Sequence, residues 1–537
     1  MSCLFVITAV AILSCVPPVS RDALTHHLAV PKLWLAQGAV CEIPAISFSY
    51  YPMNLDLLYA VPLYFGNDIL PKFIHFSFSL LTAWLMFSYL RKRLDIFYAL
   101  LGVFFFLSLP VIIKLSISVY VDLGLIFFSF ASLVCLFKWI EKEFHLRFLI
   151  LSAIFCGLAL GTKYNGLILL FLLSFFVPYI SSSNLSQPAS KSVGYGVIFF
   201  IMAILIFSPW MIKNYLWTNN PLFPLYDKWF NPVYADTANH ISHFILRSIN
   251  YDESWWEIAL IPVRIFFQGA DGSPRLFDGK LNPLLFLFPF FAFLPLRTGD
   301  SSIGYKEAVQ RYQIEKKILL AFSILFLLIA FFKADMRIRY VAPIIPPIVI
   351  LAVFGLHNTL TFFKLRCSAK VGKTGAWGVC MMVILLSSMN LAYIWEQFKY
   401  VDPIPYIKGQ ITRDAYIEKY CREYPALRFA NENLPGNSKI LGFFMGNRLY
   451  YSDREMIFDI ALFQEAAKKT DLPENIVSAL DKKNITHLLI RYDLFNVWIR
   501  DNFDSDARQE IKILFKKHLT LLFSRGGYGL FQVESGR

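Results

Sequence analysis

The chain has 537 residues, of which 56% are hydrophobic and only 17% are charged, and its mean hydropathy is +0.51. These values exclude an ordinary soluble globular protein and indicate a membrane protein with several spans. The formal net charge of +13 does not indicate binding to nucleic acid, because the lysines and arginines collect in short loops between apolar segments.

Hydropathy predicts about eleven spans, each near the length that crosses roughly 30 Å of hydrocarbon. The first apolar run lacks the basic start and the small-residue cleavage site of a signal peptide. We therefore interpret it as a short span of a chain whose true start can lie upstream. The predicted spans are residues 2–18, 69–90, 96–114, 120–139, 148–162, 164–180, 193–211, 281–296, 317–332, 340–356 and 376–395.

The basic residues predict the orientation of these spans. They gather in alternate loops, for example at residues 91–93 and 364–373, and short loops rich in lysine and arginine stay in the cytoplasm. We expect a multi-pass protein of the inner (cytoplasmic) membrane. Loops 19–68 and 212–280 and everything after residue 396 then face outward.

The pattern after the last span is that of a soluble domain. SKILGFFM, NRLYYSD, ITHLLIRY and YGLFQVES read as strands, and residues 425–434, 461–469 and 473–482 read as helices. We therefore expect an α-helical polytopic membrane module, residues 1–396, followed by an extracytoplasmic α/β domain, residues 397–537. No nucleotide-binding or zinc-ribbon motif occurs in the sequence.

The first polar run, SRDALTHHLAVPKLWLAQG, carries the first candidate for chemistry. Asp22 follows the first span by a few residues, and a carboxylate at a membrane boundary is costly unless it is solvated, paired or used. Ser20 is suited to start a helix and Gly38 to end one. Asp22 and His26 would then share a helical face, and His26 and His27 are also compatible with ordinary surface histidines.

Two further charged residues lie at predicted span ends. Asp122, in SVYVDLGLIFF, enters the fourth span with Lys114 just before it, so it is either a functional carboxylate or the ion-pair partner of Lys114. Lys163, in LALGTKYNGL, emerges where an anionic lipid head group would lie. It is a candidate phosphate partner, and a snorkelling anchor is the alternative.

Outer segments supply the remaining candidates. FFKADMRIRYVAPIIPP brings Arg337 and Arg339 into an outward turn beside Asp335, against the positive-inside bias, so either an anionic ligand or an ion-pair network explains them. His240 and His243 have helical i, i+3 spacing and are the metal-ligand candidates, with ordinary histidines as the alternative. SWWEIALIPVRIFF predicts an amphipathic helix lying on the membrane.

Taken together, these segments resemble the GT-C superfamily of membrane glycosyltransferases, and they are similar to bacterial protein O-mannosyltransferases and aminoarabinose transferases. The resemblance rests on Asp22 with HHLAVPKLW, YVDLG, GLALGTKYNG, PWMIKNYLWTNNPLFP and RIRYVAPIIPP. The tail resembles the periplasmic domains of such proteins through YPALRFANENLPGNSKIL, RLYYSDRE and ITHLLIRY.

The resemblance implies an inverting transfer of a sugar from a polyprenyl-phosphate donor to a glycan, lipid or protein acceptor at the outer face, in cell-envelope synthesis. By position, Asp22 matches the general base. The substrate-binding candidates are Asp122, Lys163, Arg337, Arg339 and His27.

The family often has two adjacent acidic residues at the first site, whereas Arg21 and Ala23 flank Asp22 here. No cofactor is therefore firmly implied, and a divalent metal stays an open alternative. A lipid or solute transporter, or a lipid-linked glycan ligase, is the alternative from another class. A third alternative is a member that binds polyprenyl phosphate without catalysis.

Overall fold

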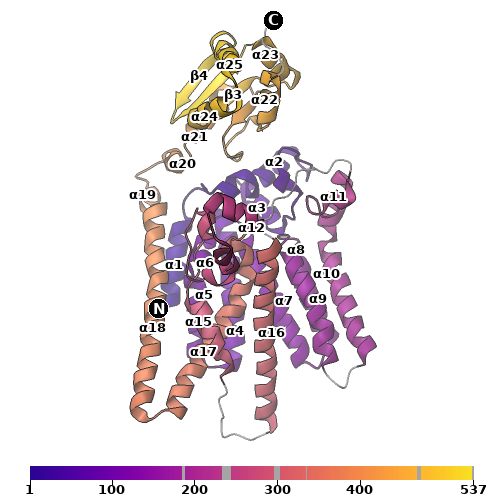
Figure 1. Cartoon of the computed structure of the whole chain (residues 1–537), viewed down its shortest axis with the longest axis vertical. Helices are drawn as coiled ribbons and strands as arrows, with labels where there is room; N and C mark the ends of the chain where they lie inside the picture. The colour runs from indigo at the N-terminus through magenta and orange to yellow at the C-terminus, as the bar shows by residue number, and fades with distance from the viewer. Residues whose placement is uncertain (184–187, 233–242, 295–302, 334, 469–472, 535–537) are drawn as a thin grey trace. The chain divides into compact units, whose positions relative to one another are not determined.

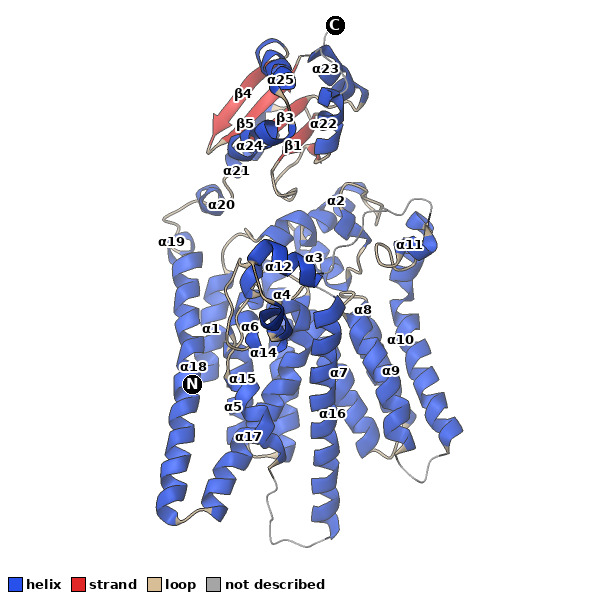
Figure 2. Cartoon of the chain, viewed as in Figure 1, coloured by secondary structure: helices blue, strands red, loops and turns tan. Residues whose placement is uncertain are grey.

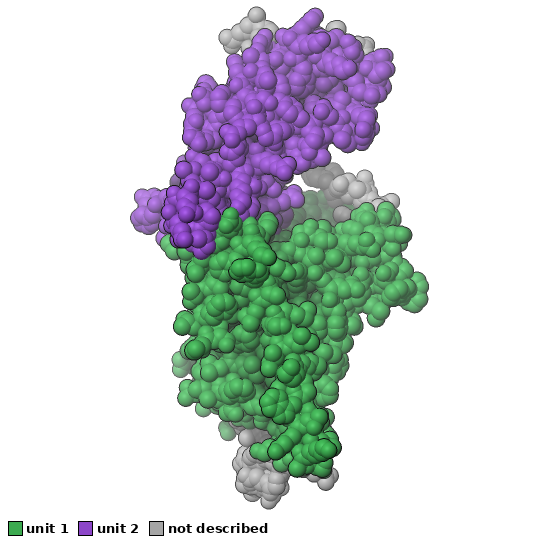
Figure 3. Space-filling model, turned by 90° about the vertical axis from the view of Figure 1, so that its left-hand side faces the viewer, with its two compact units in different colours: residues 1–15, 50–58, 70–403 green, residues 16–49, 59–69, 404–537 purple. Residues whose placement is uncertain are grey.

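The computed structural model describes all residues except 184–187, 233–242, 295–302, 334, 469–472 and 535–537 (Figure 1). Helices occur along the whole chain, and the strands belong to its C-terminal part (Figure 2). The described residues form two compact units (Figure 3). Unit 1 comprises residues 1–15, 50–58 and 70–403, and unit 2 comprises residues 16–49, 59–69 and 404–537. Unit 2 thus combines most of the predicted outer loop 19–68 with the tail.

Unit 1 is helical. Helix α3, Asn54–Tyr64, begins in unit 1 and ends in unit 2. The other helices of unit 1 are α1 Ser2–Ser14, α4 Leu70–Arg93, α5 Ile96–Ser108, α6 Pro110–Ser116, α7 Asp122–Glu141, α8 Leu146–Leu160, α9 Gly166–Ser182, α10 Ala189–Thr218, α11 Asp227–Phe230, α12 His243–Tyr251, α13 Trp255–Ala259, α14 Ile261–Arg264, α15 Leu284–Leu287, α16 Ile303–Lys333, α17 Ile345–Arg366 and α18 Ala369–Val401. Short 3₁₀ segments are η3 Pro274–Leu276, η4 Phe288–Phe293 and η5 Ile338–Ile344.

Each predicted span coincides with a helix or a pair of helical segments in the described residues. Within the described ranges, five helical segments are long and apolar enough to cross a membrane: α4, α7, α10, η5 with α17, and α18. The bent pair α5 and α6 adds a sixth, and α1, α8, α9 and α15 with η4 are shorter and apolar. A multi-pass membrane protein is therefore confirmed. The total of about eleven spans stays a prediction.

The break between α5 and α6 shapes the end of this bundle that the sequence predicts to face outward. Pro110 has no amide hydrogen to continue α5 and instead begins α6, and the two helices meet at 64°. Helix α6 carries Lys114, so the bend sets where this lysine lies. The amide of Val111 donates to the carbonyl of Lys280 at 3.2 Å, which ties α6 to the end of the predicted outer loop 212–280.

The outer loop after α10 differs from the prediction in one respect. SWWEIALIPVRIFF does not form one helix but two short ones, α13 and α14, because Pro262 lies at the start of α14. Trp255 and Trp256 are exposed. A position on the membrane surface stays a prediction for this segment.

Unit 2 contains a five-stranded sheet in the order β2-β1-β3-β5-β4. Strand β1 pairs in parallel with β2 and β3, and β5 pairs antiparallel with β3 and β4. The strands are β1 Lys439–Phe443, β2 Glu455–Ile457, β3 His487–Arg491, β4 Leu519–Arg525 and β5 Tyr528–Val533. The helical segments of unit 2 are η1 Ala23–His27, α2 Ala29–Gln37, α20 Arg413–Tyr420, α21 Tyr424–Asn433, α22 Ile460–Lys468, α23 Pro473–Lys482, α24 Tyr492–Asn502 and α25 Ser505–Lys517, while η2 Ser47–Tyr50 and α19 Pro403–Ile407 lie at its borders with unit 1.

Alternate residues of the strands face two different apolar clusters, as the pleat requires. Leu441, Leu488 and Phe531 pack with α22, α23, α24 and α25 on one face. Ile440 and Leu489 pack with α21 on the other face. The predicted C-terminal α/β fold is confirmed as a three-layer arrangement.

One predicted strand is wrong. NRLYYSD, residues 447–453, forms a turn, because the amides of Leu449 and Tyr450 both donate to the carbonyl of Leu24 at 3.0 Å instead of to a neighbouring strand. Strand β4, which lies at the edge of the sheet, was not predicted.

Candidate functional site

Three cations of unit 1 gather around one aromatic ring. Lys163 lies in the turn between α8 and α9, and Arg337 and Arg339 lie at the start of η5. Their charged ends are 5.0, 5.9 and 5.4 Å from the centre of the Tyr340 ring. The guanidinium of Arg339 also lies 5.1 Å from the ring of Tyr120. Three of the predicted substrate-binding residues therefore form one group, which we call the Tyr340 cluster.

Asp122 lies in the same region, and its ion-pair partner is Lys163 rather than Lys114. Its Oδ1 accepts from Lys163 Nζ at 2.7 Å, and its side chain is 1% exposed. Lys114 instead bonds Asp278 at 3.0 Å and Asp271 at 3.1 Å. The alternative prediction, that Asp122 is the ion-pair partner of Lys114, is therefore wrong. The second carboxylate oxygen of Asp122 is buried and has no hydrogen-bond partner within the described part of the chain.

His75, in α4, was not predicted as a site residue. Its Nδ1 lies 2.9 Å from the carbonyl of Leu115 and 3.0 Å from that of Ser118, and its Nε2 lies 3.0 Å from the amide of Leu123. Nδ1 therefore donates and Nε2 accepts, as in a neutral imidazole. The ring thus holds the first turn of α7, which carries Asp122. An ionisable residue inside a predicted span was the available signal.

A second set of ion pairs adjoins the Tyr340 cluster. Arg337 is 3.2 Å from Asp335 and 3.9 Å from Asp278, so the predicted network with Asp335 does form. Burial alone would raise the pKa of Asp278, but the charges of Lys114 and Arg339 and the amide of Gly272 hold that pKa below its ordinary value. Asp278 is therefore ionised at neutral pH and fixes Lys114 beside Arg337.

Gly161, in LALGTKYNGL, allows close packing beside Lys163. The backbone amide of Asn54 donates to the carbonyl of Gly161 at 2.9 Å, and its side-chain Nδ2 donates to the carbonyl of Leu158. A Cβ on Gly161 would lie 2.2 Å from that nitrogen. Trp210 Nε1 in turn donates to Asn54 Oδ1 at 2.8 Å. Gly161 thus allows α3, α8 and α10 to meet next to Lys163.

Lys213 is a further cation that was not predicted as a site residue. Its Nζ lies 4.9 Å from the ring centre of Trp210 and 4.8 Å from that of Trp217, and 3.5 Å from the carbonyl of Tyr51. The available signal was its place in PWMIKNYLW, where two tryptophans stand three before and four after the lysine and so share its helical face.

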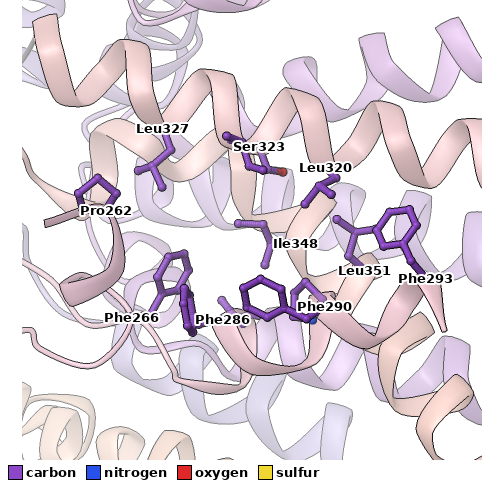
Figure 4. A pocket seen from close by; sticks show the side chains of 13 residues that line it. Pro262, Phe266, Phe286, Phe290, Phe293, Leu320, Ser323, Leu327, Ile348 and Leu351 are labelled. Carbon is purple, nitrogen blue, oxygen red and sulfur yellow. The ribbon is translucent and has the colours of Figure 1, made fainter. Parts of the chain in front are cut away.

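An apolar pocket of about 260 Å³ lies between α14, α15 with η4, α16 and α17 (Figure 4). Phe266, Phe286 and Phe290 line one side, and Leu327 and Ile348 line the other. Ile348 is in the first turn of α17, directly after the η5 segment that carries Arg339. The pocket can hold a hydrocarbon chain.

Asp22 and His27 lie in unit 2. Asp22 is half-buried and comes directly before η1, a π-helix in which the amide of Leu28 donates to the carbonyl of Ala23 at 2.9 Å. The bonds of a π-helix join residues five positions apart, and Asp22 stands at the start of this wider turn. The helical face predicted to be shared by Asp22 and His26 stays a prediction. Gly38 ends α2 with φ +69°, as predicted.

The two adjacent histidines are not ordinary surface residues. His26 and His27 are 8% and 7% exposed, with their ring centres 4.0 Å apart. His26 stacks on Phe48 at 4.4 Å, and its Nδ1 lies 2.8 Å from the hydroxyl of Thr25. These contacts place both rings in the packed interior of the predicted loop 19–68.

A metal site is not built by the described residues, which include no group of three or more His, Cys, Asp or Glu side chains able to hold an ion. His240 lies outside the described residues, and His243 begins α12 with a side chain that is not described.

Residues 44–222, less than half of the chain, match the family model of dolichyl-phosphate-mannose-protein mannosyltransferases. A search of curated proteins finds no match.

Similar solved structures include ArnT from Cupriavidus metallidurans in the apo state, with a TM-score of 0.56, 12% identity, and coverage of 98% of this chain and 97% of that one. The same protein bound to undecaprenyl phosphate has a TM-score of 0.53 with the same identity and coverage. The Archaeoglobus fulgidus oligosaccharyltransferase in the apo form has a TM-score of 0.53 and 10% identity, and covers 91% of this chain and 69% of that one.

Proposed function

We propose a reaction for this chain from its fold. The fold is that of the GT-C superfamily of membrane glycosyltransferases, which the sequence motifs predicted and the comparisons support. The reaction is the inverting transfer of a sugar from a polyprenyl-phosphate donor to an acceptor hydroxyl. It takes place at the outer face of the cytoplasmic membrane, in the synthesis of a cell-envelope glycan, glycolipid or glycoprotein.

The Tyr340 cluster is the observation that carries this proposal. The departing group of such a reaction is a lipid phosphate, whose charge grows as the bond to the sugar breaks. Fixed cations near that charge stabilise the transition state more than the ground state. Lys163, Arg337 and Arg339 supply three of them around one ring, and ArnT is similar in fold and binds undecaprenyl phosphate.

The apolar pocket supports a donor with a hydrocarbon chain. Its lining is hydrophobic apart from Ser323, and it begins next to the helix that follows the Tyr340 cluster. A ligand with a phosphate at Arg339 and a prenyl segment beside Ile348 would match this order of polar and apolar surface.

Asp22 is the proposed general base. The acceptor oxygen forms a bond to the anomeric carbon, the bond from that carbon to the phosphate oxygen breaks, and the acceptor proton passes to the Asp22 carboxylate. The polyprenyl phosphate leaves with the electron pair of the broken bond. A positioned carboxylate contributes about 10²-fold or more to such a proton transfer. Asp122 holds Lys163 rather than touching the reacting atoms.

The test measures transfer from synthetic polyprenyl-phosphate sugars by the full chain in nanodiscs, with donor binding measured separately. Asp22→Asn should bind donor normally and transfer about 10²-fold more slowly. Arg337→Gln should weaken donor binding by about 10-fold or more, because it removes a charged hydrogen-bond donor. Lys280→Met is the control, since Lys280 pairs with Glu396 and lies outside the Tyr340 cluster.

Normal transfer by Asp22→Asn would refute the base assignment. Donor binding that is equally strong in Arg337→Gln and Lys280→Met would refute the role of the Tyr340 cluster. Movement of intact donor across a proteoliposome membrane without any transfer would favour the transporter instead.

A further inference from the structure

The RLYYSDRE motif of the tail is not explained by the proposed reaction. Its central residues form the turn Leu449–Asp453 between β1 and β2, and its last residue, Glu455, begins β2. We call this segment the 449–453 turn. The turn and the segments that it contacts all belong to unit 2.

The 449–453 turn binds the segment that carries Asp22. The amides of Leu449 and Tyr450 both donate to the carbonyl of Leu24, two residues after Asp22, at 3.0 Å. The hydroxyl of Tyr451 donates to the carbonyl of Pro18 at 2.8 Å. The loop around Asp22 is therefore held on both sides of that residue by one turn of the tail.

Lys32 extends the same attachment to α2. Its Nζ donates to the carbonyls of Tyr450 and Ser452 at 2.9 Å each and to Asp453 Oδ1 at 2.8 Å. All three hydrogens of the ammonium are thereby used. Helix α2 directly follows η1, so this contact fixes the far end of the π-helix that begins after Asp22.

Apolar and ionic contacts complete the attachment. Leu24 packs with Ile417 and Cys421 of the tail, and Val19 and Tyr451 border this cluster. The second arm of the outer loop is bound as well, because Asp68 accepts from Arg413 and from the hydroxyl of Tyr450. The same short turn thus contacts both arms of the loop.

We propose that the 449–453 turn and Lys32 are positioning elements for Asp22, so that the tail domain sets the place of the base although it supplies no reacting group. This inference rests on the proposed function of Asp22. A base must be held within a fraction of an ångström of its productive place, and residues that lock its support contribute through that precision. The loop around Asp22 gains this rigidity from residues of the tail that lie far from it in the sequence.

Lys32→Met is the decisive variant, because it keeps the length of the side chain and removes all three hydrogen bonds. Lys439→Met is the matched control, since Lys439 is a lysine of the same domain that pairs with Glu455 at 2.9 Å. It lies in β1 and not in the 449–453 turn. Tyr451→Phe removes only the bond to Pro18 and serves as an independent second variant.

Two measurements are made on the full chain in nanodiscs. Steady-state transfer should show kcat lowered about 10-fold in Lys32→Met, with the KM for donor within about 2-fold of wild type, since a displaced base affects the chemical step. Hydrogen exchange should be faster for the amides of residues 23–28 in Lys32→Met and Tyr451→Phe than in Lys439→Met.

The two readouts separate this inference from the proposed function. Normal transfer by Asp22→Asn refutes the base assignment, while the exchange data still report whether the 449–453 turn holds the loop. Exchange at residues 23–28 that is the same in Lys32→Met and Lys439→Met overturns the inference. It is also overturned if exchange is faster but kcat is unchanged, or if KM changes while kcat does not.

Discussion

Lys163→Met tests how much of the Tyr340 cluster is needed for folding. The Asp122 side chain is 1% exposed, and its Oδ1 has Lys163 Nζ at 2.7 Å. Removing one partner of a buried ion pair leaves an uncompensated charge and costs about 3–5 kcal/mol. The charge of Arg339 also acts on Asp122, so we expect the lower end of this range, about 3 kcal/mol of lost unfolding free energy.

Removing the carboxylate instead, in Asp122→Asn, should cost less unfolding free energy. In Asp122→Asn the remaining charge is on Lys163, whose side chain is 18% exposed and can reach water through its flexible stem. We expect a loss of about 1 kcal/mol. The double variant Lys163→Met with Asp122→Asn should resemble Asp122→Asn alone, which gives a coupling energy of about 3 kcal/mol between the two sites.

The assay is denaturant unfolding of the ligand-free protein in micelles, followed by tryptophan fluorescence. Lys280→Met is the reference, because its partner Glu396 is 58% exposed and such surface pairs contribute about 0–1 kcal/mol. If Lys163→Met is no less stable than Lys280→Met, or if Asp122→Asn does not restore it, Lys163 does not serve to neutralise Asp122 and the reasoning is refuted.

Three other outcomes are expected. Burial alone would raise the pKa of Glu253, but Arg247 and Arg264 lower it below the ordinary 4.5; stability from this group is therefore present above pH 4.5 and is lost as the pH falls through the lowered pKa. Acid unfolding below pH 4.5 should accordingly be less steep in Glu253→Gln. Gly161→Ala should lower the unfolding midpoint, because its Cβ would meet Asn54; an unchanged midpoint would show that α3 adjusts freely. An alkaline phosphatase fused at the C-terminus should be active in cells, and activity of a cytoplasmic reporter there instead would reverse the predicted orientation.

Hydropathy predicted the positions of the apolar helices well, because the bilayer imposes a length and an apolar composition on every segment that crosses it. The same reasoning could not place the break at Leu109 within one predicted span, although Pro110 was visible in the sequence. It also could not find the π-helix Ala23–His27, which depends on a backbone bond between residues five apart. Nothing in ALTHH distinguishes that bond from an ordinary helical turn.

Long-range partners account for the other differences. NRLYYSD has the alternation of a strand, but its amides bind the carbonyl of Leu24, more than four hundred residues earlier in the chain. Strand β4 lies at the sheet edge with several exposed residues, so it lacks the apolar alternation that identifies a half-buried strand. Lys114 is close to Asp122 in sequence, yet the bend between α5 and α6 directs it to Asp271 and Asp278.

These partners also explain how a positive cluster can lie at a predicted outer face. Four cations of this region, Lys114, Lys163, Arg337 and Arg339, lie among four carboxylates, Asp122, Asp271, Asp278 and Asp335. The positive charges are therefore balanced, and a phosphate that binds one of these cations must displace the carboxylate paired with it. Attraction falls with distance, and Arg337 has its carboxylates at 3.2 and 3.9 Å, whereas Lys163 has Asp122 at 2.7 Å. Of these two cations, Arg337 can exchange partners at the lower cost, so we propose that it contributes more than Lys163 to binding the donor phosphate, beside Arg339.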